Sequence, residues 1–412
     1  MLLVFTIGTY IPIPMVDTVA IQAEITNNNF LTILNAFSGG GLSNFSILAL
    51  GISPYITSSI VIQMLQVVIP KWKEWSEQGE VGKQKLNRIT RYVSIVLALV
   101  QGLALLFGLG ARPENILVAD VLEDRNLFWL FYIYMAIVIT AGSCFTMWLA
   151  DLITRHGIGN GSSMIIAAGI ITSVPAMFTT LWVKYIADGA ANAGNITCFV
   201  VIIVLYILMI FAVVFFEGAK RRIPIQYANR QQGGSSELPI KLNSASVIPV
   251  IFASTILSIP LTITGMLGQN SSVAGIWVNN IFSYQEPIGM TLYILLIFFF
   301  SFFYSFMMVD PEKISDNLDR QGAYIPGYRR GEETKNQLAR ILFRVTLLGA
   351  TYLAIVALVP IIVSLSFGFT ANEASTITVG GTSLIIVVGV AIETFNQIET
   401  ASETKDYKGF LE

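Results

Sequence analysis

The side chains with the clearest chemical potential are arginines in two polar segments, 217–241 and 310–340, where glycine and proline favour turns. They are Arg221, Arg222, Arg230, Arg329 and Arg330. A guanidinium group can bind a carboxylate or a phosphate through two parallel hydrogen bonds. A solvated charge adds little to stability, so these arginines predict a docking surface for an acidic or polyanionic partner. Topogenic charge and affinity for anionic lipids are the simpler explanations.

Other kinds of chemistry find little support in the sequence. The one histidine, His156, follows Arg155, where a solvated role fits best, and the two cysteines, Cys144 and Cys198, lie in apolar runs. No nucleophile and base pair, carboxylate dyad or His/Cys cluster is visible. We therefore predict no catalytic residue, no metal site and no cofactor, and an intramembrane enzyme is a weak hypothesis.

Composition identifies the class of protein that must position these residues. The chain has 412 residues, of which 54% are hydrophobic and 12% are charged, against roughly 25% charged in ordinary globular proteins. So few charges cannot cover a water-facing surface. The same figures exclude intrinsic disorder, a collagen-like repeat and a nucleic-acid-binding protein, so a polytopic membrane protein remains.

A membrane span needs about 20 mostly apolar residues, and nine apolar runs fit that length, with a single charged residue, Arg344, near the start of the eighth. They are 46–69, 92–110, 128–150, 162–183, 196–216, 245–264, 288–309, 341–365 and 377–392. A tenth run, 1–13, is too short to cross and lacks the features of a signal peptide, so we expect the tail of a first span. The runs predict an all-α polytopic membrane protein of ten transmembrane helices, the first of them truncated.

Basic residues orient these spans. Of the 24 Lys and Arg residues, all but Arg112, Arg125 and Lys184 fall on one side of the ten crossings. By the positive-inside rule that side is the cytoplasm, and both termini lie there. No charged residue lies in the middle of a run, which argues against a proton-driven or ion-coupled transporter.

Two features depart from plain spans. Segment 31–45 contains three consecutive glycines, so we expect either an outer loop without a role or a mobile segment that folds back into a cavity. Pro54 and Pro249 lie near the starts of the second and seventh spans. Proline in a membrane helix can be a packing kink, and paired breaks in two halves of a chain can mark a central site.

Seven long motifs give the chain a family resemblance. In order they are SGGGLSNFSILALGISPYITSSIVIQMLQ, EWSEQGEVGKQKLNRITRY, WLADLITRHGIGNGSS, RRIPIQYA, LPIKLNSASVIPVIFAS, DPEKISDNLDRQGAYIPGYRRG and GGTSLIIVVGVAIET. In these stretches, which run from Tyr10 to about Glu393, the chain resembles the SecY family, the large subunit of the bacterial protein-conducting translocon. The resemblance implies two pseudo-symmetric halves, 1–183 and 184–412, around an hourglass pore.

The resemblance also implies roles for single residues. The pore ring would consist of Ile52, Ile56, Ser162, Ile166, Ile251 and Ile386, with Ser162 where the family usually has an aliphatic residue. The plug, at about 31–45, would include Leu34, Phe37, Gly39, Gly40, Gly41 and Leu42. The lateral gate between the second and seventh spans would involve Pro54, Pro249 and Asn243. The arginines Arg221, Arg222, Arg230, Arg329 and Arg330 would bind partners, although the family has a proline where Arg330 stands.

The function that follows is a passive channel in the bacterial plasma membrane, which conducts unfolded secretory polypeptides and releases hydrophobic segments into lipid. Aliphatic side chains dewet a constriction and offer a passing chain no hydrogen-bond partner. The partners implied are the SecE and SecG subunits, the motor ATPase SecA, the ribosome, secretory preproteins and anionic lipids. A small-molecule secondary transporter is the alternative, because it can share the span number and the inverted halves.

Overall fold

Long helices make up most of the chain. The computed structural model describes residues 1–14, 16, 18, 35, 38–109, 128–187, 193–227, 236–266, 273–283, 286–367, 369 and 371–408. In these ranges the helices are α1 (Leu2–Gly8), α4 (Ser53–Val68), α5 (Pro70–Glu77), α6 (Glu80–Leu109), α7 (Phe128–His156), α8 (Gly161–Trp182), α9 (Ala193–Gly218), α10 (Ile248–Met266), α11 (Val273–Phe282), α12 (Pro287–Met308), α13 (Pro311–Arg320), α14 (Glu332–Ser366) and α15 (Ala371–Lys408). A π-helical turn, Val183–Ala187, extends α8.

The ten predicted spans fall in order on α1, α4, α6, α7, α8, α9, α10, α12, α14 and α15. Among the described residues, six helical stretches are long and apolar enough to cross a membrane by themselves, in α6, α7, α8, α9, α12 and α14. α4 and α5 pass the same test as a pair, bent by 106°, and α10 has a shorter apolar stretch, Ile248–Leu261. α11 was not predicted, because a ten-residue helix is too short to stand out as a span.

The prediction that the second span begins at residue 46 was wrong. Residues 46–52 form turns and a bridge, and α4 begins only at Ser53. Pro54 is the second residue of α4 and Pro249 the second residue of α10, where the missing N–H costs no helical hydrogen bond. These two prolines therefore start their helices and do not kink them. The prolines inside described helices are Pro175, Pro260 and Pro360.

A three-stranded antiparallel sheet joins the two polar segments, and the sequence analysis did not predict it. β1 (Lys220–Tyr227) pairs with β2 (Ser236–Lys241) and with β3 (Ala323–Tyr324), in the order β2-β1-β3. Along β1 the side chains of Ile223 and Ile225 are buried while Arg222 and Gln226 are exposed, the alternation expected of a half-buried strand. Segments 217–241 and 310–340 are therefore parts of one structure.

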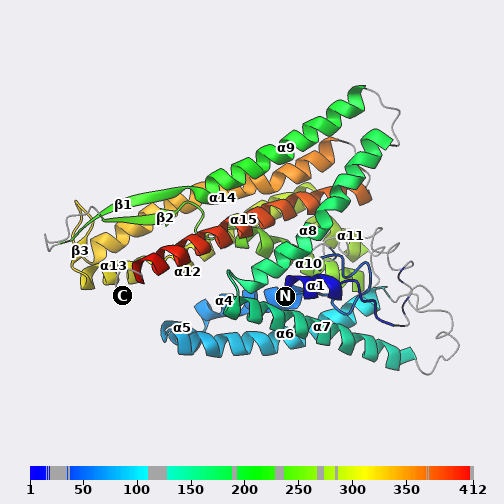
Figure 1. The fold of residues 1–412 in the computed structure, drawn as a ribbon, viewed down its shortest axis with the longest axis horizontal. Coiled ribbons are helices and arrows are strands. Elements are labelled where there is room, and N and C mark those ends of the chain that lie inside the picture. The colour runs from blue at the N-terminus through cyan, green and yellow to red at the C-terminus, as the bar shows by residue number, and fades with distance from the viewer. Residues whose placement is uncertain are drawn as a thin grey trace.

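We call this structure the platform: β1, β2, β3, α13 and the tip 325–331 that precedes α14. Its small core contains Ile223 and Ile240 from the sheet, Ile325 from the tip, and Leu338 and Leu342 from the first turns of α14. The platform lies at the left-hand end of the molecule, where α5 and the end of α15 also lie (Figure 1). That grouping agrees with the predicted placement of the basic loops on one side.

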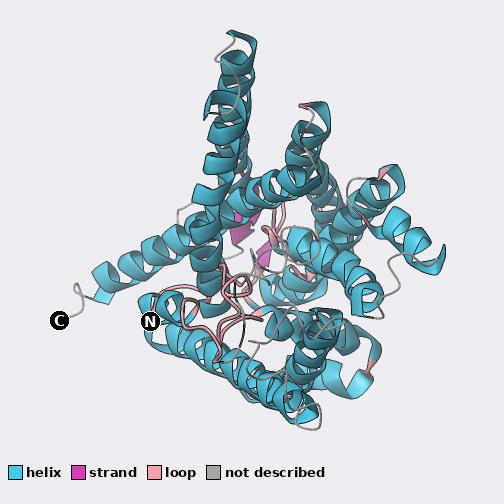
Figure 2. Cartoon of the chain, turned by 90° about the vertical axis from the view of Figure 1, so that its right-hand side faces the viewer, coloured by secondary structure: helices cyan, strands magenta, loops and turns pink. Residues whose placement is uncertain are grey.

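The helices pack as two groups with two different seams between them. α4, α6 and α7 pack together in the first group, and α9, α12, α14 and α15 pack together in the second. On one side α8 packs closely along α15, whereas on the other α10 packs against α6 and only lightly against α4. Viewed from the right-hand end of Figure 1, loop segments lie among the helices (Figure 2).

One of these internal loops depends on a glycine of α7. A Cβ atom added to Gly142 would lie 1.8 Å from the backbone oxygen of Ile47, so only glycine allows this loop to approach α7. The hydroxyl of Ser143, the next residue, donates to the backbone oxygen of Gly51 at 3.3 Å. Together these contacts hold the loop that leads into α4.

We expect Gly142→Ala to lower the free energy of unfolding by about 2 kcal/mol or more, because the methyl group forces the backbone apart. The matched control is Gly102→Ala in α6, where the nearest atom to an added Cβ is 3.7 Å away and the substitution fits. The melting temperatures of both variants are measured by thermal unfolding in detergent micelles. Equal melting temperatures for the two variants would contradict the close approach.

Candidate functional site

The residues assigned to the pore ring come from four helices. Ile52 is the residue just before α4, Ile56 lies in the first turn of α4, Ser162 and Ile166 lie at the start of α8, Ile251 in the first turn of α10 and Ile386 within α15. The buried members, Ile52, Ile166, Ile251 and Ile386, belong to one hydrophobic cluster, and Ile56 packs against it. The structure therefore brings the isoleucines into a common core. Their closure into a single ring remains a prediction.

Ser162 differs from the isoleucines in its environment. It is half-buried, and its hydroxyl and backbone N–H both donate to Oδ1 of Asn160, at 2.8 and 3.1 Å. Asn160 thereby caps α8 at its N-terminus. The hydroxyl that stands in an aliphatic position is thus satisfied locally, four residues before Ile166 on the same helix face.

The described part of the plug segment, residues 35 and 38–45, is folded into the protein. Ser38, Leu42 and Phe45 are fully buried, and the backbone of 38–45 follows turns. Leu42 and Phe45 pack in a second cluster with side chains of α6 and α7. The burial fits the expectation of a segment that folds back into the protein. Leu34 and Phe37 lie outside the described residues.

Glycine allows this segment to reach α8. Gly39 has a φ of +69°, and a Cβ on it would lie 2.8 Å from Cα of Gly169. The hydroxyl of Thr172 lies 3.0 Å from the backbone oxygen of Gly39 and 2.5 Å from that of Gly169, so these two oxygens share its one proton. Gly169 is three residues beyond Ile166, about 4.5 Å further along the helix axis. The segment therefore contacts α8 on the far side of Ile166 from the start of the helix.

Internal hydrogen bonds hold the glycine turns in shape. The backbone N–H of Gly40 donates to the backbone oxygen of Asn35 at 2.9 Å, and that of Ser43 donates to Oδ1 of Asn35 at 2.8 Å. The N–H of Ser46 donates to the oxygen of Gly41 at 2.8 Å. These short-range bonds satisfy backbone groups that no helix or sheet pairs.

The seam on the α10 side carries a side-chain hydrogen bond that the sequence analysis did not identify. The hydroxyl of Tyr304 on α12 donates to Oε1 of Gln63 on α4. The amide nitrogen of Gln63 donates to the hydroxyl of Ser59 at 2.9 Å, which leaves Oε1 to face α12. Two polar side chains on otherwise apolar helices were the sequence signal for this contact.

Asn243, assigned to the lateral gate, lies in the turn that leads into α10. Its amide donates to Oε2 of Glu217 and to the backbone oxygen of Ser246, both at 3.0 Å. Glu217 is buried at the end of α9, so these contacts lie within the second group of helices. Asn243 thus holds the start of α10 in place, and a direct role between α4 and α10 remains a prediction.

The platform presents the arginines of the two polar segments. Arg221, Arg222, Arg329 and Arg330 are all exposed, and Arg230 lies outside the described residues. Arg222 pairs with Glu237 across the sheet at 3.4 Å. The guanidinium of Arg330 donates to the oxygen of Gly322 at 3.3 Å and lies 5.6 Å from the ring centre of Tyr324. Exposure thus agrees with the prediction, but Arg330 is held back against β3.

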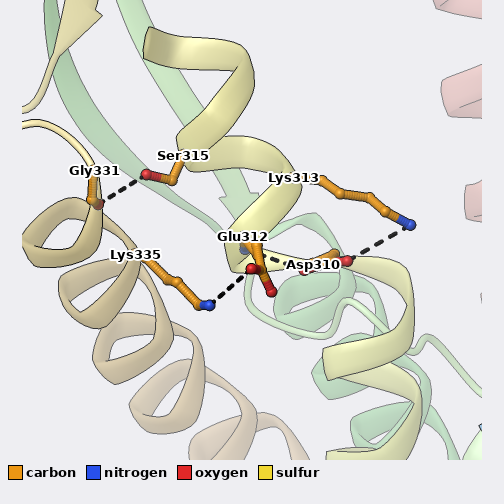
Figure 3. Close-up of polar contacts among 6 residues, drawn as sticks. All are labelled: Asp310, Glu312, Lys313, Ser315, Gly331 and Lys335. Carbon is orange, nitrogen blue, oxygen red and sulfur yellow. Dashed lines mark hydrogen bonds and ion pairs between the residues drawn. The ribbon is translucent and has the colours of Figure 1, made fainter.

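Arg329 has a fixed backbone and an exposed side chain. Its N–H donates to the carboxylate of Glu333 at 3.0 Å, and its oxygen accepts from the hydroxyl of Thr334 at 2.8 Å. Figure 3 shows how α13 braces the next residues: Ser315 donates to the oxygen of Gly331 at 3.1 Å, and Glu312 pairs with Lys335 at 3.1 Å. The tip is therefore rigid where Arg329 projects from it.

The described residues contain no group of three or more His, Cys, Asp or Glu side chains placed to hold a metal ion. His156 is exposed at the end of α7. The candidate site therefore consists of buried apolar side chains, glycines at close backbone contacts and exposed arginines.

Comparison with known proteins identifies what this arrangement is similar to. The family model described as SecY matches residues 46–395. The chain is 42% identical to the protein translocase subunit SecY of Bacillus licheniformis and 41% identical to that of Bacillus subtilis. Each alignment covers 100% of this chain and 94% of the relative.

Solved structures share the fold. A structure of a protein conducting channel aligns with a TM-score of 0.62 at 18% identity, over 97% of this chain and 90% of that one. Sec61 in the canine ribosome-channel complex from the endoplasmic reticulum aligns over the same shares, with a TM-score of 0.61 at 18% identity. These comparisons favour the channel over the small-molecule transporter.

We expect the bond between Gln63 and Tyr304 to give a coupling energy of about 1 kcal/mol in a double-mutant cycle of Gln63→Leu and Tyr304→Phe. The reason is that either single change removes the same hydrogen bond, so the second change then costs less. The free energy of unfolding is measured in mixed micelles for the wild type, the two single variants and the double variant. The cycle subtracts the effect that each substitution has by itself. Strictly additive losses would show that the two side chains do not interact.

Proposed function

The chain belongs to the SecY family, and from this premise we propose that it is the channel-forming subunit of a protein translocase. It conducts unfolded secretory polypeptides across the bacterial plasma membrane and releases hydrophobic segments into the lipid. The observation that carries the proposal is that Ile52, from the turn before α4, and Ile166, Ile251 and Ile386, from α8, α10 and α15, all belong to the main buried hydrophobic core. The distribution of basic residues favours an orientation with both termini in the cytoplasm.

The isoleucines serve as the constriction of the channel. An aliphatic ring excludes water and ions, and it gives a translocating chain no fixed hydrogen-bond partner on which to stall. Ile56, in the first turn of α4, lies four residues after Ile52, the residue that precedes this helix, and extends the apolar surface. Ser162 belongs to the same ring, where its hydroxyl is already bound to Asn160. The polar substitution therefore adds no free donor to the pore.

The plug is the segment that contacts α8 beyond Ile166. Gly39, Gly40 and Gly41 allow turns that a rigid helix could not make, and Leu42 anchors the segment among α6 and α7. A few hydrogen bonds of about 1 kcal/mol each hold it. Such a segment seals the channel at rest and leaves when a polypeptide enters, with little loss of folded structure.

The lateral gate lies between α4 and α10. Pro54 and Pro249 lie in the first turns of these two helices and fix where each helix begins. Each helix can therefore tilt about its first turn when the gate opens. Packing between α4 and α10 is light, whereas α8 and α15 pack along one another. The two groups of helices therefore separate on the α10 side while the α8 side remains closed. Asn243 positions the start of α10 through Glu217.

The platform is the docking surface for the partners that supply energy. SecA and the ribosome bind there through Arg221, Arg222, Arg230, Arg329 and Arg330, which meet carboxylates or RNA phosphates. SecE and SecG complete the channel, secretory preproteins are its substrates, and anionic lipids surround it. Arg329 is the best placed of the described arginines, because its backbone is held and its side chain is exposed.

We expect Arg329→Glu to abolish ATPase-driven translocation of a secretory preprotein into proteoliposomes and to leave folding intact. Arg330→Glu should cause a smaller loss, because Arg330 is engaged with Gly322 and Tyr324. The measurement is ATP-dependent protection of the preprotein from protease. The matched control is Arg340→Glu on α14, which lies outside the platform and removes the same charge. Wild-type transport by a correctly inserted Arg329→Glu variant would contradict docking at this arginine.

We expect deletion of 31–45 to raise the ion leak of reconstituted channels, and Thr172→Val to raise it less. The valine keeps the shape of Thr172 but leaves the backbone oxygen of Gly39 without its donor, a loss of about 1 kcal/mol. Thr351→Val is the control, because the hydroxyl of Thr351 bonds only within its own helix, to Leu347. Unchanged conductance after the deletion, at normal expression, would rule out a plug.

A further inference from the structure

The chain that enters α10 is held between helices of the second group. Residues 242–247, which we call the entry segment, join β2 to α10. A Cβ atom added to Gly349 of α14 would lie 2.7 Å from the backbone oxygen of Leu242. One added to Gly389 of α15 would lie 2.6 Å from Cγ1 of Val247. Two helices therefore leave room for the entry segment by means of a glycine, and any side chain at these positions would displace it.

A third helix, α9, holds the entry segment through a polar contact. Glu217 near the end of α9 is 5% exposed, and its Oε2 accepts from Nδ2 of Asn243 at 3.0 Å. The same nitrogen donates to the backbone oxygen of Ser246 at 3.0 Å. Ser246 has a φ of +52°, which is unfavourable for a residue other than glycine. A buried carboxylate without a partner is costly, so Glu217 favours the one arrangement in which Asn243 reaches it.

Two residues assigned to the constriction lie close to these contacts. α10 starts at the platform end of the molecule and α15 ends there, so the two helices run in opposite directions (Figure 1). Ile251 comes four residues after Val247, and Ile386 comes three residues before Gly389. These separations correspond to rises of about 6.0 and 4.5 Å along the helix axes. The contact between Val247 and Gly389 therefore sets Ile251 and Ile386 at about the same depth.

We propose that Glu217 is a positioning residue of the channel: through Asn243 it fixes the entry segment, and α10 moves about this fixed point when the gate opens. The proposal rests on the proposed function, which assigns Ile251 to the constriction and α10 to the gate. Contacts with α9, α14 and α15 hold the start of α10, whereas packing between α10 and α4 is light. The start of α10 therefore stays with the second group of helices while the rest of this helix tilts away from α4.

An engineered disulfide measures the position of the entry segment. A Cβ on residue 389 would lie 3.5 Å from Cβ of Val247, a separation that a disulfide can span. The full chain carries Val247→Cys/Gly389→Cys together with Cys144→Ser and Cys198→Ser, and its disulfide is equilibrated with glutathione. We expect Glu217→Leu to lower the equilibrium constant for disulfide formation on the order of tenfold, because a freely moving entry segment lowers the effective concentration of one thiol near the other.

Two further variants separate positioning from general loosening. Glu217→Gln keeps an oxygen that can accept from Asn243, so its equilibrium constant should stay within about twofold of that of the parent protein. Tyr206→Phe is the matched control on α9, since it removes a buried hydrogen bond to the backbone oxygen of Ile377, near the start of α15. It should leave the equilibrium constant unchanged. Equal losses for Glu217→Leu and Tyr206→Phe, or no loss for Glu217→Leu, would overturn the role of Glu217.

Melting temperatures show whether each variant folds. If Glu217→Leu does not fold, Asn243→Ala removes the other partner of the same hydrogen bond and takes its place in the measurement. It should lower the equilibrium constant in the same way, and an unchanged constant would overturn the proposal.

Transport by the cross-linked protein tests the fixed point. ATP-dependent uptake of a preprotein into proteoliposomes is measured for the oxidised and the reduced Val247→Cys/Gly389→Cys protein. Equal rates are expected, because the disulfide joins two parts that do not separate when the gate opens. A block on oxidation that reduction relieves would show that the entry segment moves, and would overturn the fixed point. Failure of the parent protein to transport would count against the proposed function, while the disulfide equilibrium would still report the role of Glu217.

Discussion

The constraint on which this structure depends is that backbone polar groups inside a bilayer must find partners within the protein. Helices meet it by themselves, but the turns at 38–52 do not. They survive because protein surrounds them: Asn35 and Thr172 bond their backbone, and Gly142 and Gly169 give them room against α7 and α8. Non-helical chain at the centre of the bundle is therefore a stable feature of this fold.

A second consequence is the difference between the two seams. α8 and α15 join the groups of helices along an extended contact, while α10 meets α4 lightly and Tyr304 reaches Gln63 through one hydrogen bond. A seam closed by few contacts separates before a seam closed by many. In the channel proposed above, the direction of opening would follow from this distribution of packing. That is what a passive conduit for a driven polypeptide requires.

The platform shows how an aqueous docking surface can be attached to such a bundle. Its sheet joins two segments that lie far apart in the chain, since Gln226 pairs with Tyr324, 98 residues later. Ile223 and Ile325 bury the apolar side of the platform against α14, so the charged side must face water. The same packing gives the two arginines different surroundings, since Arg330 lies against Tyr324 while Arg329 is exposed.

The sequence by itself determined the membrane class and the order of the spans, because apolar run length and charge placement are local properties, and its long motifs determined the family. It could not determine the sheet, since β1 and β3 pair across a long stretch of chain. It could not determine the true start of α4 either, because residues 46–52 are as apolar as the residues of the helix that follows them. The roles of Gln63 and Tyr304, and the different surroundings of Arg329 and Arg330, were decided only by the tertiary structure. Each depends on which side chain from a distant segment comes within hydrogen-bonding distance, and no spacing along one segment contains that information.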